Sequence, residues 1–210
     1  MVSKETKYDE RFVDVDFTEK YEHGHLKMQR TFAKKYIDKL RNRNFHLGRI
    51  LDAGCAFGEM LILIGKEFEN STLTGIDISD NFIYRAKEKA IQHELDDRAK
   101  FIKADVHNIP FPDHYFDVVI NTNMLHVVED PILMLNEIER VLSKDGIFFI
   151  ADIRKSWLNI IEKEIKNAYS INELRELIDK SNLRKGVEQI NLLWWKYESN
   201  HKYALNRRIG

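Results

Sequence analysis

The sequence predicts a doubly wound α/β fold, in which a mostly parallel sheet of six or seven strands carries helices on both faces. From about residue 50 onward, short β-rich runs alternate with amphipathic runs at the spacing of βα units. A turn that contains two glycines, within "ILDAGCAFGEM" at 50–60, follows the first apolar run. The chain has 210 residues and 43% apolar content, which is enough for one well-buried domain.

The elements of this unit can be placed in order. The predicted strands cover 49–53, 72–78, 99–105, 115–123 and 146–153. Helices are expected at 58–68, after the N-cap residue Ser79, and after the pair Asp130 and Pro131, where proline suits the first helical position. Gly146 is expected to end the last of these helices. The result is five strands with helices between them.

Two further segments flank the unit. Residues 24–43 are predicted to form a helix, and the inward-facing residues are Phe32, Tyr36, Ile37 and Leu40. On the other side we expect an amphipathic helix at 156–168, a helix opened by the capping box "SINE" at 170–173, a sixth strand at 187–198 and a candidate seventh at 201–209.

No repeat or linker divides the chain, so one domain is expected over 1–210. Within it we distinguish a helical lid segment (1–48), a cofactor-binding core (49–152) and a C-terminal segment with the remaining helices and last strands (153–210).

Composition excludes several classes of function. The 33 basic and 34 acidic residues nearly cancel, so a nucleic-acid partner is not expected. Cys55 is the only cysteine, and the pair His23 and His25 lacks a clear third ligand, so no metal site is expected. The polar start and the lack of a membrane-length apolar run predict a cytoplasmic protein without a membrane partner, either a monomer or a homodimer.

The glycine turn after the first strand is the usual place for a ligand in doubly wound folds. The dinucleotide pattern GxGxxG fails here, because Ala56 and Glu59 stand where its second and third glycines would be. No Gly-Lys-Ser/Thr follows, which excludes a P-loop. Asp52 and Glu59 would repel a pyrophosphate, so these acids predict a cationic ligand.

Acids after the next two strands refine this prediction. Asp77 closes the second strand at the spacing where such folds bind ribose hydroxyls with a carboxylate. Asp105 ends the third predicted strand and is followed by Val106, a pair suited to an adenine amine and ring. Ribose, adenine and a positive group without phosphates describe S-adenosylmethionine.

The chain resembles class I S-adenosylmethionine-dependent methyltransferases, near the group that acts on small molecules. Four motifs carry the resemblance: "ILDAGCAFGE", "LTGIDIS", "FIKADVHNIPFPDHYFDVVINTNMLHVVEDP" and "RVLSKDGIFFIAD". Ala56 departs from the glycine that the family most often has there. The resemblance implies a Rossmann-like fold and S-adenosyl-L-methionine as cofactor, with these cofactor-binding residues: Asp52, Gly54, Ala56, Gly58, Asp77, Ile78, Asp105, Val106 and Asn121.

Other residues are candidates for the reaction itself. His126 follows the fourth strand and is a candidate general base, although it can equally order its loop by a hydrogen bond. Cys55 is interpreted as a small residue in a tight turn. Tyr21, Arg154 and Trp157 are candidate substrate residues, with a surface ion pair as the alternative for Arg154.

The function predicted is transfer of the sulfonium methyl group to a small-molecule acceptor by in-line displacement. Two alternatives remain. One is an RNA or protein methyltransferase that uses the basic residues of 30–49, and the other is a noncatalytic protein that binds S-adenosylmethionine.

Overall fold

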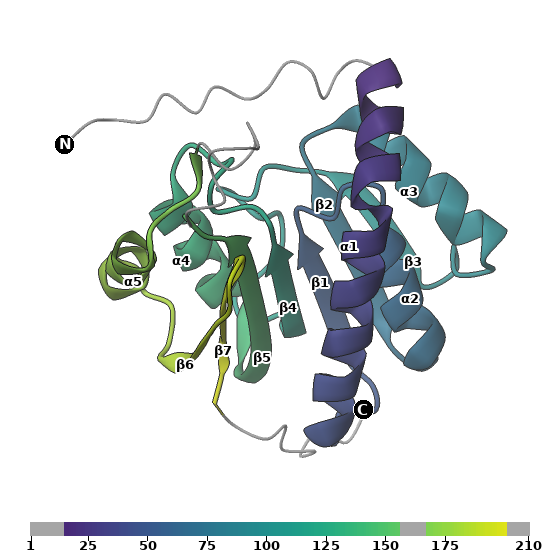
Figure 1. Cartoon of the computed structure of the whole chain (residues 1–210). Coiled ribbons are helices and arrows are strands. Elements are labelled where there is room, and N and C mark those ends of the chain that lie inside the picture. Colours follow the sequence, from purple (N-terminus) through teal and green to yellow (C-terminus); the bar gives the residue numbers. More distant parts are fainter. Residues whose placement is uncertain (1–14, 156–166, 201–210) are drawn as a thin grey trace.

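The structure, a computed structural model, describes residues 15–155 and 167–200. Its strands form one seven-stranded sheet in the order β3-β2-β1-β4-β5-β7-β6 (Figure 1). Neighbouring strands from β3 to β5 are parallel, whereas β7 is antiparallel to both β5 and β6. The strands are β1 (Arg49–Ala53), β2 (Thr72–Asp77), β3 (Ala99–Lys103), β4 (Phe116–Thr122), β5 (Leu142–Ile153), β6 (Gly186–Ile190) and β7 (Trp194–Ser199). The predicted doubly wound fold is confirmed.

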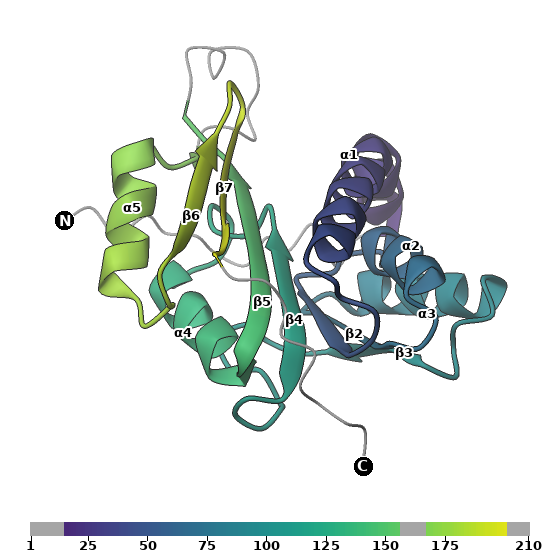
Figure 2. The same cartoon turned by 90° about the horizontal axis from the view of Figure 1, so that it is seen from below.

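Helices cover both faces of this sheet, as predicted. The helices are α1 (Val15–Asn42), α2 (Glu59–Glu67), α3 (Asp80–Gln92), α4 (Pro131–Val141) and α5 (Ile171–Lys180). Figure 2 shows α1, α2 and α3 on one face and α4 and α5 on the other. One buried apolar cluster lies under each set of helices, and the aliphatic residues of β1 and β4 alternate between the two clusters.

Three helix starts confirm the capping signals. The Ser79 hydroxyl accepts a hydrogen bond from the backbone N–H of Phe82. The Asp130 carboxylate accepts from the two N–H groups of the first turn of α4, with Pro131 at the first position. The capping box at Ser170 and Glu173 is complete. These contacts explain why the three boundaries could be predicted closely.

Other boundaries were predicted wrongly. α1 begins at Val15 rather than at residue 24, so His23 and His25 both lie within this helix. α4 ends at Val141, before Gly146, because Leu142 already adopts an extended conformation and pairs with Phe116 of β4.

The predicted sixth strand at 187–198 is in fact a hairpin of two strands. The Asn191 side chain accepts hydrogen bonds from the N–H groups of Leu193 and Trp194, and this turn divides the run into β6 and β7. Trp195 is buried among the residues under α4 and α5, while Trp194 packs against Phe32 on the other face. The candidate strand at 201–209 and most of the helix at 156–168 lie outside the described residues.

The carboxyl ends of β1, β2, β4 and β5 meet at one edge of the sheet, where a doubly wound fold places its ligand. The N-terminal half of α1 packs beside this edge: Tyr21 and Leu26 lie against the cluster of Ala56, Phe57 and Phe82. Within the described part of the chain, no helix has the length and apolarity needed to cross a membrane.

Candidate functional site

The loop between β1 and α2 has an unusual backbone. Gly54, Ala56 and Gly58 all have positive φ angles, of 88°, 45° and 75°. A Cβ at Gly54 would come within 2.4 Å of the Met124 sulfur, so a larger residue here would strain the backbone and would have to displace the Met124 side chain. Ala56 adopts the left-handed conformation at a steric cost that a glycine at this position would avoid. The loop is thus shaped for close approach of a ligand to its backbone.

Asp52 is the most unusual charge at this edge. Its side chain is fully buried at β1, and neither carboxylate oxygen has a hydrogen-bond partner in the described structure. Burial, with a smaller repulsion from Asp77, raises the pKa of Asp52 to about 8. A buried carboxylate without a partner is unfavourable, and a cationic ligand would supply the missing interaction.

Asp77 ends β2 and connects the strand to the glycine loop. Its Oδ2 accepts a hydrogen bond from the N–H of Ala56 at 2.9 Å, and its Oδ1 accepts from the N–H of Ser79 at 3.0 Å. Burial raises the pKa of Asp77 to about 6, although these backbone hydrogen bonds oppose the shift. The backbone of Ile78 also donates to this carboxylate, and since a carboxylate can accept about four hydrogen bonds, it can still accept from a ligand hydroxyl.

The predicted cofactor residue Ile78 and the predicted adenine residues Asp105 and Val106 lie on the neighbouring loops. Ile78 directly follows β2 with 42% of its surface exposed, whereas Val106 is buried. Asp105 lies beyond the end of β3 rather than in the strand as predicted, because pairing with β2 ends at Lys103. Its contacts in the described structure, with the N–H and Nδ1 of His107, all use Oδ1. Oδ2 therefore remains available to a ligand amine.

Asn121 is buried near the end of β4, one residue before Thr122. Its Nδ2 donates a hydrogen bond to the carbonyl of Ala53 at 2.8 Å, while its Oδ1 has no partner. Asn121 therefore joins the end of β4 to the end of β1 and leaves one buried acceptor unsatisfied at the edge where these strands end.

His126 belongs to a buried pair that the sequence analysis did not anticipate. Its Nδ1 lies 2.7 Å from Oδ1 of Asp152 on β5, and the other oxygen of Asp152 accepts from the N–H of Leu125 at 2.6 Å. Nε2 of His126 has no hydrogen-bond partner in the described structure. Asp152 occupies the carboxyl end of its strand, as Asp52 and Asp77 do, and this position was the signal that could have revealed it.

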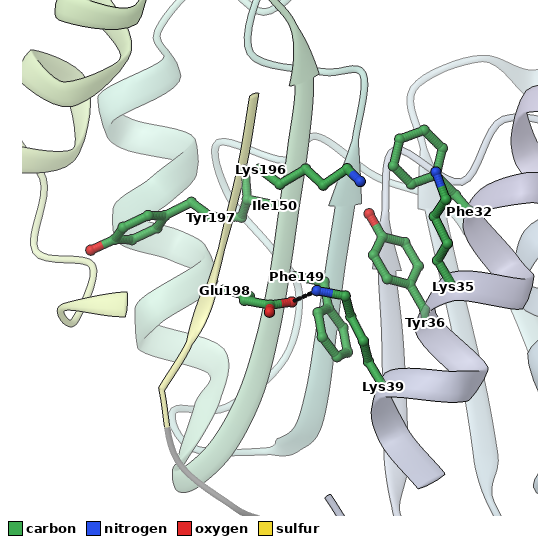
Figure 3. A pocket seen from close by; sticks show the side chains of 9 residues that line it. All are labelled: Phe32, Lys35, Tyr36, Lys39, Phe149, Ile150, Lys196, Tyr197 and Glu198. Carbon is green, nitrogen blue, oxygen red and sulfur yellow. Dashed lines mark hydrogen bonds and ion pairs between the residues drawn. The ribbon is translucent and has the colours of Figure 1, made fainter. Parts of the chain in front are cut away.

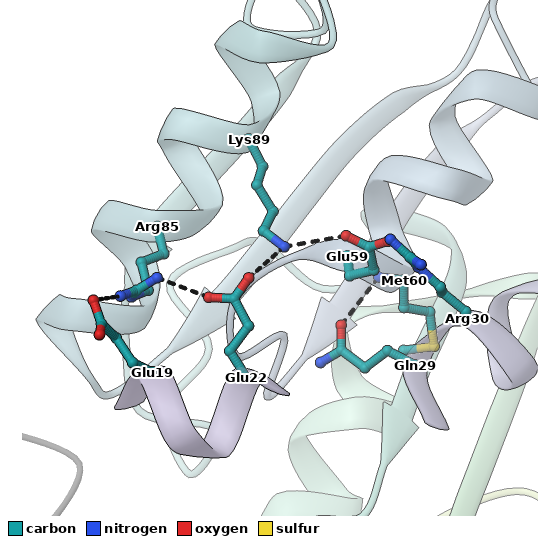
Figure 4. Close-up of polar contacts among 8 residues, drawn as sticks. All are labelled: Glu19, Glu22, Gln29, Arg30, Glu59, Met60, Arg85 and Lys89. Carbon is teal, nitrogen blue, oxygen red and sulfur yellow. Dashed lines mark hydrogen bonds and ion pairs between the residues drawn. The ribbon is translucent and has the colours of Figure 1, made fainter. Parts of the chain in front are cut away.

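Glu59 is paired with two cations of the same chain, although the sequence predicted that its charge would act on the ligand. Arg30 donates to one oxygen at 2.7 Å and Lys89 to the other at 3.1 Å, within a network that joins α1, α2 and α3 (Figure 4). Burial raises the pKa of Glu59, but these hydrogen bonds outweigh burial and the net shift is downward. The preference for a cation therefore rests on Asp52 and Asp77.

Two of the three candidate substrate residues, Tyr21 and Arg154, lie in the described part of the chain. Tyr21 stacks on His25, with ring centroids 3.7 Å apart, and lies beside the glycine loop. Among the described residues, the guanidinium of Arg154 donates to the carbonyls of Asn191 and Lys155 and to no carboxylate. Trp157 lies outside the described residues. These three assignments stay predictions.

Cys55 is buried inside the glycine loop, where its thiol contacts the carbonyl of Ala56. Burial and the neighbouring Asp77 and Asp52 raise its pKa well above the ordinary value. The thiol is therefore held in its unreactive protonated form, in agreement with its interpretation as a small residue in a tight turn.

The basic residues of α1 pair largely with acids of the same chain. Arg30 binds Glu59, Lys39 binds Glu198, and Arg41 binds Glu67. These pairs leave a small part of the basic run available to a polyanion, which weakens the argument for an RNA partner.

Comparisons with known proteins agree with this geometry. Residues 45–200 match the family described as methyltransferase domain. Two curated relatives are the 27-O-demethylrifamycin SV methyltransferase of Amycolatopsis mediterranei and the ubiquinone/menaquinone biosynthesis C-methyltransferase of Rickettsia massiliae. The first is 36% identical over 104 residues, which cover 50% of this chain and 38% of the relative. The second is 30% identical over 151 residues, which cover 70% of this chain and 59% of the relative.

A solved structure shows the same fold. The SAM-dependent methyltransferase from Aquifex aeolicus superposes with a TM-score of 0.64 at 22% identity, over 72% of this chain and 80% of that one. The chain spans less than two thirds of the two curated relatives, so their reactions are not transferred by similarity alone. The family match nevertheless covers most of the described chain, including every strand of the sheet. The chain therefore belongs to the methyltransferase domain family.

Proposed function

We propose that this protein is an S-adenosylmethionine-dependent methyltransferase whose acceptor is a small molecule. The single observation that carries the proposal is the buried, unpartnered carboxylate of Asp52 at the end of β1, next to a glycine loop with left-handed backbone. The acceptors here fit a cationic nucleoside and do not fit a pyrophosphate, because the carboxylate of Asp77 would repel it and it offers no positive charge to Asp52.

Each cofactor residue has a role in this proposal. Asp52 and the free oxygen of Asn121 attract the positive methionine part, and Gly54, Ala56 and Gly58 allow its close approach. The carboxylate of Asp77 accepts from the ribose hydroxyls. The nucleobase is held by three residues of the neighbouring loops, namely Ile78, Asp105 and Val106.

When bound, S-adenosylmethionine supplies a methyl group on an electrophilic sulfonium. The chain holds and orients the reactants, and the strand-end residues exclude water from the place of transfer. An acceptor hydroxyl or ammonium must also lose a proton. Asp152 holds Nδ1 of His126, so Nε2 is oriented to take that proton as the general base.

A small-molecule acceptor is favoured over RNA by the internal pairing of Arg30, Lys39 and Arg41. The names of the two curated relatives also refer to small-molecule chemistry, in rifamycin and in ubiquinone/menaquinone biosynthesis.

Calorimetric titration of the apoprotein with S-adenosylmethionine tests the proposal. We expect saturable binding at one site, weakened at least tenfold by Asp52→Asn. Lys144→Gln is a matched surface control, because Lys144 is exposed, remote from the loop, and should leave the affinity unchanged. Absence of binding would refute the proposal, and binding without S-adenosylhomocysteine release across an acceptor screen would favour the noncatalytic alternative.

A further inference from the structure

A narrow cleft lies between α1 and the strands β5 and β7, on the sheet face covered by α1. Its wall is basic and aromatic (Figure 3). Three lysines reach it: Lys35 and Lys39 from α1, and Lys196 from β7. The apolar floor is formed by the rings of Phe32, Tyr36 and Phe149.

One acid lines the cleft, and it is already engaged. Oε2 of Glu198 accepts from Lys39 at 2.5 Å. Oε1 accepts from Gln189 at 3.2 Å and lies 3.5 Å from the guanidinium of Arg43. Glu198 therefore balances Lys39 and Arg43, and its carboxylate has little capacity left for the other two lysines.

Lys35 and Lys196 form no ion pair with a carboxylate in the described structure. Both reach the ring of Phe32, with their Nζ atoms 5.5 Å and 5.8 Å from its centroid. Burial lowers the pKa of Lys196, and repulsion from Lys35 and Lys39 lowers it further, while attraction to Glu198 opposes the shift. Two neighbouring cations on one aromatic ring repel each other, and an anion bound between them would relieve this repulsion.

The cleft adjoins the edge of the sheet at which the cofactor residues lie. Lys196 is paired in the sheet with Ala151, whose carbonyl accepts from the N–H of Asn123 in the loop after β4. The Tyr36 hydroxyl, beside the same cleft, lies 2.8 Å from Oγ1 of Thr122 at the end of β4. An acceptor positioned at the end of β4 could therefore extend a charged group toward the lysines.

We propose that Lys35 and Lys196 bind an oxyanion, a carboxylate or a phosphate, and that this oxyanion is the anionic end of the methyl acceptor. The acceptor class is then an organic acid or a phosphate ester. This assignment rests on the proposed methyltransferase function, but the oxyanion site itself can be tested without any transfer.

The first test is titration of the apoprotein with inorganic phosphate, and separately with acetate, at constant ionic strength. Binding is followed by NMR signals of the lysine side chains. We expect saturable shifts of Lys196 and Lys35. Lys35→Gln and Lys196→Gln should each weaken binding of the preferred anion at least tenfold. Lys34→Gln, a neighbouring exposed lysine of α1 that does not line the cleft, should change it less than twofold.

The two anions distinguish the possible acceptors, since preference for phosphate points to a phosphate ester and preference for acetate to a carboxylic acid. Equal binding in all three variants, or no shift of Lys196 with either anion, would overturn the site. Affinity for S-adenosylmethionine is measured on the same variants and should not change, so failure of the oxyanion site can be told apart from failure of the methyltransferase assignment.

A second test asks whether the oxyanion belongs to the acceptor. Carboxylic acids and phosphate monoesters are each paired with the neutral amide or alcohol, and S-adenosylhomocysteine release is measured. We expect release only with the anionic members, and a drop of at least tenfold in kcat/KM for Lys196→Gln. Equal release with the neutral members would overturn the acceptor assignment.

Discussion

Asp152 holds His126 from the end of β5: Nδ1 of the imidazole lies 2.7 Å from Oδ1 of the carboxylate, and both side chains are buried. Asp152 also accepts from the N–H of Leu125, so one carboxylate orders the loop after β4 and orients the imidazole. This arrangement joins the two interpretations of His126, as a base and as a loop-ordering residue. A substitution can still separate them.

His126→Asn separates the two roles. The asparagine amide can still donate to Asp152, so the loop should stay ordered, but the variant has no imidazole Nε2 to take a proton. For a hydroxyl acceptor we expect kcat to fall by about 100-fold or more, with affinity for S-adenosylmethionine unchanged. The measurement is steady-state release of S-adenosylhomocysteine with an acceptor from the screen. Wild-type kcat in this variant would leave His126 with the loop-ordering role alone.

Asp52 should make the apoprotein less stable as the pH rises. Its pKa is raised from 3.8 to about 8 in the folded state, so the folded protein holds this proton more tightly than the unfolded chain. The contribution of this bound proton to the stability of the folded state is fully present below about pH 4, and it is lost as the pH rises toward about 8.

The variant Asp52→Asn removes this loss. We expect its free energy of unfolding to exceed that of the wild type by at least ~1 kcal/mol at about pH 8, and the excess to shrink toward about pH 5. Urea unfolding of both apoproteins at the two pH values measures it. A less stable variant at the higher pH would show that the carboxylate already has a favourable partner.

Binding of the cofactor should release a proton near neutral pH. A cation beside Asp52 favours its ionised form, and the apoprotein carries a proton there because burial raises the pKa to about 8. Affinity for S-adenosylmethionine should therefore rise by up to about tenfold per pH unit between about pH 6 and pH 8. Calorimetry in buffers of different ionisation enthalpy counts the protons, and Asp52→Asn should bind with a flat profile. A flat profile in the wild type would place the cation elsewhere.

Asp77→Ala tests the ribose assignment. Loss of charge-assisted hydrogen bonds should weaken binding of S-adenosylmethionine by about 1 to 3 kcal/mol, and of S-adenosylhomocysteine by the same amount because both carry the ribose. Since Asp77 also accepts from the N–H groups of Ala56 and Ser79, the melting temperature should fall as well. Unchanged affinity for both ligands, by calorimetry, would exclude the ribose role.

Local signals predicted most of the core. Ser79, Asp130 and Ser170 cap helices by hydrogen bonds to residues two or three positions later, so their role can be predicted from the local sequence. The acids Asp52 and Asp77 were found because strand ends in a doubly wound fold converge on one edge. For the same reason Asp152 could have been found.

Long-range contacts explain what was missed. Glu59 pairs with Arg30 of α1 and Lys89 of α3, and this partnership depends on how three helices pack. The cleft of Lys35 and Lys196 is formed by residues far apart in the chain, and neither lysine has a local sequence pattern that predicts it. The division of 187–198 into β6 and β7 depended on the side-chain hydrogen bonds of Asn191.

In the ion-pair network between α1, α2 and α3, the two cations Arg30 and Lys89 bind the same acid, Glu59 (Figure 4). They are expected to differ in how much they stabilise the fold. Lys89 has 16% of its side chain exposed and contacts both Glu59 and Glu22, whereas Arg30 is 59% exposed and contacts Glu59. Exposed pairs are weakened by water, so Arg30→Met should cost less than about 1 kcal/mol. Lys89→Met leaves two acids without this partner and should cost about 2 kcal/mol.

Urea unfolding at neutral pH, in low and high salt, measures both variants. The cost of Arg30→Met should vanish in high salt, whereas that of Lys89→Met should persist because the shielded pairs are screened less. Lys87→Met, at an exposed position of α3 outside the network, is the control and should change stability by no more than about 0.5 kcal/mol. Equal costs for Lys89→Met and Arg30→Met would mean that α1 is held on α3 by its apolar contacts, such as that between Tyr21 and Phe82, and not by these ion pairs.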